Sequence, residues 1–336
     1  MNQSKINLDL YTGKGKRLSE RKLNKMPECD WEPDKANTYD ADKGLRDAVN
    51  VAISLGQPLL VTGEPGTGKT LLASSIKYEL EIPGPFIFNA KTTSVARDLF
   101  YQYDALRHFQ DAHTPGHKLE KQEYVQYNAL GKAILLATPQ KEIDSLPDVI
   151  KKHIPKDLIS KEPTRSVVLI DEIDKTPRDL PNDILNEVLE MAFTVNETGV
   201  THKASNKYRP IMIITSNSEK NLPEPFLRRC VFYHIDFPND QRLKKIVKNH
   251  FGEMRFVDQA ISHFQSIRKE KLNKKPATAE FLTWIMALQS LIHDEELDFK
   301  NLTDEQADII KLSYSILVKS QEDLDLLKAQ ISENIS

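Results

Sequence analysis

Residues 63–70 read Gly63-Glu64-Pro65-Gly66-Thr67-Gly68-Lys69-Thr70 and complete a G-x-x-x-x-G-K-[ST] pattern. The pattern follows an apolar run from Pro58 to Thr62 and precedes a segment from Leu71 to Leu80 that is predicted to be helical. A strand, a glycine-rich loop and a helix in this order aim backbone N–H groups and the positive end of a helix at one point. The stretch therefore predicts a binding site for a nucleoside triphosphate.

Two side chains of the loop suit a triphosphate and its metal ion. Lys69 is expected to reach the β- and γ-phosphates, and the Thr70 hydroxyl is expected to hold Mg²⁺. The predicted nucleotide-binding residues are Gly63, Glu64, Pro65, Gly66, Thr67, Gly68, Lys69, Thr70 and Leu71.

The composition is that of an ordinary soluble globular protein. Of 336 residues, 39% are hydrophobic and 28% are charged, which is ample for one large or two modest cores. The net charge of −3 provides no whole-chain attraction to nucleic acid or to an anionic membrane, so neither is expected as a partner. No apolar run is long enough to cross a bilayer, and the polar start of the chain does not resemble a signal peptide.

The two cysteines, Cys29 and Cys230, lie far apart and lack metal-ligand spacing. We therefore expect neither a disulfide framework nor a zinc site. This cysteine usage fits a reducing, cytoplasmic environment.

The order of predicted elements indicates an α/β domain followed by a helical one. Apolar strands are predicted at 59–62, 86–89, 167–170, 211–215 and 231–235, and a β-hairpin over 193–201. Helices are predicted over 42–55, 71–80 and 181–192, and the long polar region 97–162 is expected to be mostly helical. Beyond Pro238 only helices are predicted, over 241–250, 258–267, 279–292 and 304–320, with 322–336 either extending the last helix or fraying.

These patterns predict three parts. Residues 1–38 form a basic arm, 39–238 an α/β nucleotide domain with a parallel sheet, and 239–336 a smaller helical domain. The arm is either solvated or a strap on a neighbouring subunit or an anionic partner.

Asp171 and Glu172 directly follow the most apolar strand, 167–170. An acidic residue in this place holds Mg²⁺ in enzymes with such loops, and a glutamate after it can deprotonate an attacking water. The alternative is an acidic cap on a buried strand. No Asn-Lys-x-Asp motif that would read a guanine base occurs, so ATP is the expected nucleotide.

Three further residues are candidates for catalysis. Asn217 follows the strand 211–215 and is expected beside the γ-phosphate, with a strand-capping role as the alternative. Arg228 and Arg229 follow a short exposed-looking segment, where they could stabilise transition-state charge or form surface ion pairs.

The loop, the Asp-Glu pair, the strand-end Asn and the Arg-Arg pair resemble an AAA+ ATPase. Over residues 39–291 the sequence resembles the MoxR-like branch of this family. The segments that carry this resemblance are Gly-Glu-Pro-Gly-Thr-Gly-Lys-Thr, Leu-Ile-Asp-Glu-Ile-Asp-Lys and Leu-Pro-Glu-Pro-Phe-Leu-Arg-Arg. The resemblance implies a three-layer α-β-α domain with a helical lid. It also implies that Asp171 and Glu172 form Walker B, that Asn217 is sensor 1, and that Arg228 or Arg229 is a finger completing a neighbour's site.

The resemblance also suggests a role for two segments that interrupt the α/β pattern. The helical region 97–162 and the hairpin 193–203 stand where MoxR-like proteins carry inserts, and both are candidates for contact with a client. One element departs from the pattern, because the stretch expected to hold a sensor-2 arginine offers only Lys274 and Lys275.

The resulting hypothesis is an ATP-hydrolysing ring, expected to be a homohexamer, that remodels or assembles a protein complex. By resemblance, a protein with a von Willebrand factor A domain is the first partner to consider. The alternatives are a nucleotide-dependent switch or scaffold in a defence or signalling complex, and a nucleic-acid motor or loader. The motor would use the basic arm and the Lys269–Lys275 cluster.

Overall fold

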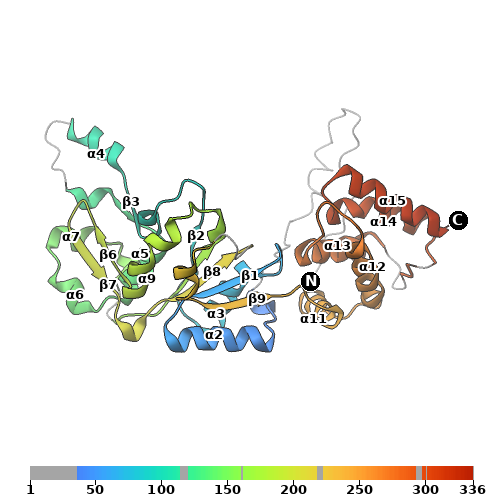
Figure 1. Cartoon of the computed structure of the whole chain (residues 1–336), viewed down its shortest axis with the longest axis horizontal. Coiled ribbons are helices and arrows are strands. Elements are labelled where there is room, and N and C mark those ends of the chain that lie inside the picture. The colour runs from blue at the N-terminus through green and yellow to red at the C-terminus, as the bar shows by residue number, and fades with distance from the viewer. Residues whose placement is uncertain are drawn as a thin grey trace, which may run out of the picture. The chain divides into compact units, whose positions relative to one another are not determined.

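The computed structural model describes residues 36–113, 120–159, 162–217, 222–292, 297–299 and 301–335. Its internal contacts divide the chain into two units (Figure 1). One comprises Tyr39–Glu64 and Gly68–Asp236, and the other comprises the chain from Phe237 onward, the loop tip Pro65–Thr67 and the residues up to Thr38. The expected basic arm lies outside the described residues, apart from the 3₁₀ turn η1 (Ala36–Thr38).

A five-stranded parallel sheet forms the centre of the first unit. All five predicted strands are present, in the spatial order β2-β5-β8-β1-β9. They are β1 (Leu59–Gly63), β2 (Phe86–Asn89), β5 (Val167–Asp171), β8 (Ile211–Ser216) and β9 (Val231–Ile235). The central strands β1, β5 and β8 are buried almost throughout, as their uninterrupted apolar sequences require.

The alternation of side chains along the strands creates two cores. Leu59 and Leu169 face one core, which is completed by α2 (Lys43–Leu55) and α3 (Lys69–Leu80). Leu60 and Ile170 face the other, which is completed by α5 (Ala129–Ala137). The domain is therefore the predicted three-layer α-β-α sandwich, and its two sides are visible in Figure 1.

The region 97–162 is mostly helical in its described residues, as predicted, but it also contains strands that the prediction missed. It contains an antiparallel strand pair, β3 (Tyr101–Tyr103) with β4 (Val125–Tyr127), and α5 belongs to the core of the domain. The prediction missed the strands because each spans only three residues, too few for alternation to be visible. The other elements are η2 (Ala96–Leu99), α4 (Ala105–Ala112), η3 (Lys121–Tyr124), α6 (Gln140–Ser145), α7 (Asp148–His153) and η4 (Lys156–Leu158).

The helix predicted over 181–192 is also shorter and divided. It consists of α8 (Leu180–Asp183) and α9 (Leu185–Glu190), and Met191 ends it in the left-handed conformation with φ 49°. The hairpin follows as β6 (Ala192–Val195) and β7 (Val200–Lys203). Three short elements complete the unit: η5 (Ile173–Lys175), η6 (Asn206–Tyr208) and α10 (Glu224–Leu227).

From Phe237 onward, the described residues form helices and no strand, as predicted. The helices of this second unit are α11 (Asp240–Phe251), α12 (Val257–Lys269), α13 (Thr278–Leu291), α14 (Asp304–Leu317) and α15 (Gln321–Ile335). They enclose one core, in which the Trp284 indole N–H donates to the Ser313 hydroxyl at 2.8 Å. The last segment neither extends α14 nor frays, because Val318 takes an extended conformation and α15 starts anew. None of the described helices is both long and apolar enough to span a membrane.

At Gly131, α5 approaches the backbone of Phe100 closely. A Cβ at this position would lie 2.0 Å from the carbonyl oxygen of Phe100. We expect Gly131→Ala to lower the free energy of unfolding by about 1–3 kcal/mol, because overpacking outweighs the gain in helix propensity of about 1 kcal/mol. Urea unfolding measures the change.

The matched control is Lys132→Ala on the same helix, which should change stability by less than about 0.5 kcal/mol. A Gly131→Ala protein more stable than the parent would contradict the close approach.

Candidate active site

Three strand ends bring the predicted site residues together. β8 lies between β5 and β1, with Thr62 level with Ser216 and Ile170 level with Ile214. Because the strands are parallel, the chain leaves all three at the same edge of the sheet. The glycine-rich loop, the Asp-Glu pair and Asn217 therefore lie side by side.

The loop backbone has the shape that its sequence demands. Gly66 and Gly68 have φ of 75° and 86°, in the left-handed region where a side chain is disfavoured. Gly68 is also the N-cap of α3, so the first turn of this helix opens directly onto the loop. The loop thus presents backbone N–H groups together with a helix N-terminus, which suits a phosphate group.

Lys69 is buried beneath the loop. Its ammonium group donates to the carbonyl oxygens of Gly63 and Glu64, at 2.8 and 2.9 Å. Burial lowers the pKa of Lys69, and the carboxylates of Asp171 and its acidic neighbours oppose that shift. The lysine charge is therefore held inside the loop, close to the place predicted for the phosphates.

Thr70 and Asp171 are in direct contact. The Thr70 hydroxyl donates to both carboxylate oxygens of Asp171, at 3.0 and 3.3 Å. Hydroxyl and carboxylate oxygens are the ligands that Mg²⁺ accepts, and such sites use one or two protein ligands beside water and phosphate. The donor set therefore fits Mg²⁺, with Thr70 and Asp171 as the protein ligands.

Thr215 links the two acidic residues. Its fully buried hydroxyl donates to Asp171 Oδ1 at 2.6 Å and accepts the backbone N–H of Glu172 at 2.8 Å. Glu172 itself is left-handed, with φ 56°, which is uncommon for a residue with a side chain. The bond to Thr215 stabilises that turn and directs the Glu172 side chain away from the strand.

Glu172 meets two hydrogen-bond donors. The Asn217 side-chain amide donates to Oε1 at 3.3 Å, and the Lys175 ammonium donates to Oε2 in a close ion pair. Lys175 holds the pKa of Glu172 below its usual value, with help from Asn217. Asn217 is fixed in turn, because its backbone N–H donates to Asp174 at 3.2 Å.

Three residues of this network were missed by the sequence analysis. Thr215 was predicted only as the last residue of a strand. A hydroxyl at the end of an otherwise apolar strand could have indicated a site residue. Asp174 and Lys175 belong to the Ile-Asp-Lys segment that was quoted for the resemblance but was given no role. Asp174 and Lys175 join the network because the 3₁₀ turn η5 keeps them close to the strand ends.

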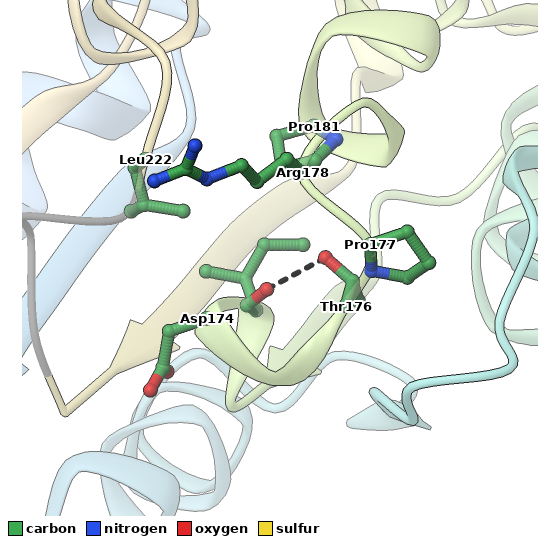
Figure 2. Close-up of a pocket in the computed structure, with 7 residues that line it drawn as sticks. Asp174, Thr176, Pro177, Arg178, Pro181 and Leu222 are labelled. Carbon is green, nitrogen blue, oxygen red and sulfur yellow. Dashed lines mark hydrogen bonds between the residues drawn. The ribbon is translucent and has the colours of Figure 1, made fainter.

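A hollow of about 240 Å³ lies beside the network (Figure 2). Asp174 and Thr176 line it, and the Thr176 hydroxyl donates to the Ile173 carbonyl at 2.7 Å. Figure 2 shows the Arg178 guanidinium extending across the hollow toward Leu222. The hollow is therefore lined by one acidic side chain, Asp174, and one basic side chain, Arg178.

The arginine pair does not join this group. Arg228 pairs with Glu224 one turn earlier, and Arg229 donates to the Pro225 carbonyl at 2.9 Å. Within the described residues, neither arginine contacts the loop or the acidic pair. Lys274 and Lys275 lie exposed on the segment that precedes α13.

The family comparison agrees with this architecture. The model of the ATPase family associated with various cellular activities (AAA) matches residues 59–239, more than half of the chain. No curated protein matches. Among solved structures, the FIGL-1 AAA domain in complex with ADP is similar, with 14% identity, a TM-score of 0.39, and coverage of 87% of this chain and 88% of that one.

Lys175 provides a direct test of the electrostatics of the site. We expect Lys175→Met to raise the pKa of Glu172 toward its usual value, because the main donor to the carboxylate is lost. A ¹³C NMR titration of labelled glutamate side chains measures this pKa, and Glu172→Gln assigns the resonance.

Lys151→Met is the control, since it removes an ion pair with Asp148 at the same i, i+3 spacing. That change should leave the titration of Glu172 unaltered. A Glu172 pKa that is equal in the parent and in Lys175→Met would contradict the ion pair.

Proposed function

Because the chain belongs to the AAA family of ATPases, we propose that it binds ATP with Mg²⁺ and hydrolyses it. The observation that carries the proposal is the contact chain from Thr70 through Asp171 and Thr215 to Glu172 and Asn217. The residues proposed as metal ligand and general base are therefore adjacent, beside the predicted phosphate-binding loop.

Each residue has a distinct task in this proposal. The loop N–H groups and Lys69 bind the phosphates, while Thr70 and Asp171 hold Mg²⁺, which supplies neutralising charge. Glu172 accepts a proton from the attacking water, and Asn217 orients the carboxylate. Since Lys175 donates to one oxygen of Glu172, we infer that this ion pair opens before Glu172 accepts a proton.

We further propose that the protein acts as a MoxR-like ring, with six copies of the chain. The exposure of Arg228, whose side chain is 75% accessible, supports a role as a finger, and Arg229 lies next to it. A finger of this kind acts on the neighbouring subunit, so a complete site would need two copies. The client would be a protein complex, with a von Willebrand factor A domain protein as the first candidate.

The parts of the chain receive corresponding roles. Residues 39–238 are proposed as the ATPase domain, 97–162 and 193–203 as its inserts for client contact, and 239–336 as the lid. Residues 1–38 are proposed as an arm, and the cytoplasm as the location. Either Lys274 or Lys275 would replace the sensor-2 arginine as a point charge.

One observation favours a second candidate, a nucleotide-dependent switch. Both oxygens of Glu172 are occupied, by Asn217 and by Lys175, and the lysine neutralises the carboxylate. An ATPase whose general base is held in this way is expected to hydrolyse ATP slowly. Binding of ATP would then assemble a complex, and hydrolysis would only reset it.

Glu172→Gln tests the role of the general base. We expect hydrolysis to fall by about a hundredfold or more while ATP binding is retained, because the amide keeps the shape of the side chain but accepts no proton. Turnover is measured by phosphate release, and binding with a fluorescent ATP analogue.

Glu190→Gln on the exposed face of α9 is the matched control and should behave as the parent. Full turnover in Glu172→Gln would contradict the proposed base. A variant without turnover that still supports the biological function would favour the switch.

Arg228→Ala and Arg229→Ala test the shared site. We expect the finger variant to lose turnover by about 10³- to 10⁵-fold. Mixing that variant with Glu172→Gln should partly restore turnover, since each subunit supplies what the other lacks.

Arg46→Ala, an exposed arginine on α2, is the control and should retain full turnover. A mixture that stays inactive, or full turnover when both arginines are replaced, would argue against a site completed by a neighbour.

A further inference from the structure

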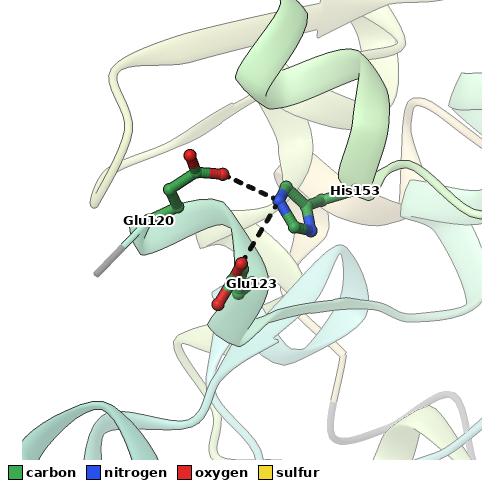
Figure 3. Close-up of side chains that lie close together, drawn as sticks. All are labelled: Glu120, Glu123 and His153. Carbon is green, nitrogen blue, oxygen red and sulfur yellow. Dashed lines mark hydrogen bonds and ion pairs between the residues drawn. The ribbon is translucent and has the colours of Figure 1, made fainter. Parts of the chain in front are cut away.

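We propose that Glu120, Glu123 and His153 form a binding site for a divalent transition-metal ion within the region 97–162. His153 Nε2 lies 3.0 Å from Glu120 Oε2 and 3.6 Å from Glu123 Oε1 (Figure 3). One donor atom from each side chain lies within 4.8 Å of the other two. The proposal is independent of ATP hydrolysis, because none of these residues belongs to the nucleotide site.

The two carboxylates converge because of the helix that carries them. Glu120 is the N-cap of η3 and Glu123 lies within it, and the Glu123 N–H donates to the Glu120 carbonyl at 2.9 Å. A 3₁₀-helix has three residues per turn, so side chains at i and i+3 stand on one line. His153, the last residue of α7, lies beside both glutamates, as Figure 3 shows.

The core holds η3 rigidly behind this face. Gln122 is buried and its amide donates to the Tyr127 hydroxyl at 2.7 Å. The Tyr124 hydroxyl donates to Asp111 at 2.9 Å, which ties η3 to α4. The buried residues Gln122 and Tyr124 flank Glu123, so the carboxylates are presented by a fixed backbone, as a metal site requires.

The surroundings of the cluster suit a bound ion. In the described part of the chain, His153 is the only basic side chain that pairs with Glu123. The three side chains are mostly shielded from water, with exposures of 18%, 18% and 26% for His153, Glu120 and Glu123. Two carboxylates and one imidazole thus place oxygen and nitrogen donors together in a half-buried setting.

The donor atoms indicate the class of metal. Carboxylates alone would suit Mg²⁺ or Ca²⁺, whereas an imidazole shifts preference toward Zn²⁺ and its transition-metal neighbours. A zinc ion at about 2.1 Å from each donor would draw the three atoms to roughly 3–3.5 Å apart, a small closure from the present spacing. Three protein ligands leave a position for water.

The proposed site lies outside the reasoning behind one sequence expectation. A zinc site was excluded because the cysteines lack ligand spacing, and that argument did not consider histidine with carboxylates. A bound ion would join η3 to the end of α7, two elements separated by a long stretch of sequence. The metal would thereby stabilise the segment that is proposed to contact the client.

The test uses the full chain without nucleotide and Zn²⁺ as the probe. We expect isothermal titration to show one strong site per chain, and Co²⁺ in the same site to give visible d–d bands. His153→Gln and Glu123→Gln should each weaken binding by about a hundredfold or more and remove the bands. Two variants are used so that a folding defect in one, seen by circular dichroism, leaves the other as the test.

Two controls locate the ion. His113→Gln removes an exposed histidine of the same region, and Asp171→Asn removes the predicted Mg²⁺ ligand. Both should bind Zn²⁺ as the parent does. The proposal is overturned if the parent binds no Zn²⁺ at micromolar concentration, which would leave a simple ion pair, or if binding is lost in a control but kept in His153→Gln.

Discussion

The site depends on one buried hydroxyl, that of Thr215. It lies at the end of β8, between the strand that bears the acidic pair and the strand that leads into the loop. By donating to Asp171 and accepting the N–H of Glu172, it fixes the proposed metal ligand and the proposed general base relative to each other. A hydrophobic residue of the same shape would leave a buried N–H unsatisfied and release the left-handed turn at Glu172.

The sheet fixes the position of the Thr215 hydroxyl. β1, β5 and β8 are covered on both faces, by α2 and α3 on one side and by α5 on the other. Strands buried in this way have little freedom to slide, because a shift by one residue would exchange the two cores. The catalytic geometry is therefore set by apolar packing far from the polar groups, which explains why the polar network can be small.

The sequence predicted the loop, the five strands and the acidic pair because each is a local pattern. Thr215 and Lys175 were missed, since their roles depend on which strands are neighbours and on the turn of η5. The strands β3 and β4 were too short for their alternation to be recognised, and helix 181–192 was overextended because Met191 gave no sign of its left-handed conformation. Glu120 and His153 are distant in sequence, so only the folded chain shows that they meet.

Two 3₁₀ turns use the same geometry for opposite purposes. In η5 the Lys175 N–H donates to the Glu172 carbonyl at 2.9 Å, and in η3 the Glu123 N–H donates to the Glu120 carbonyl at the same distance. Each turn superimposes side chains at i and i+3. In η5 the pair is Glu and Lys, so the charges cancel and the general base is restrained. In η3 the pair is Glu and Glu, and both carboxylates meet His153. The residue at i+3 thus decides whether such a turn pairs a carboxylate with a cationic side chain or places two carboxylates side by side.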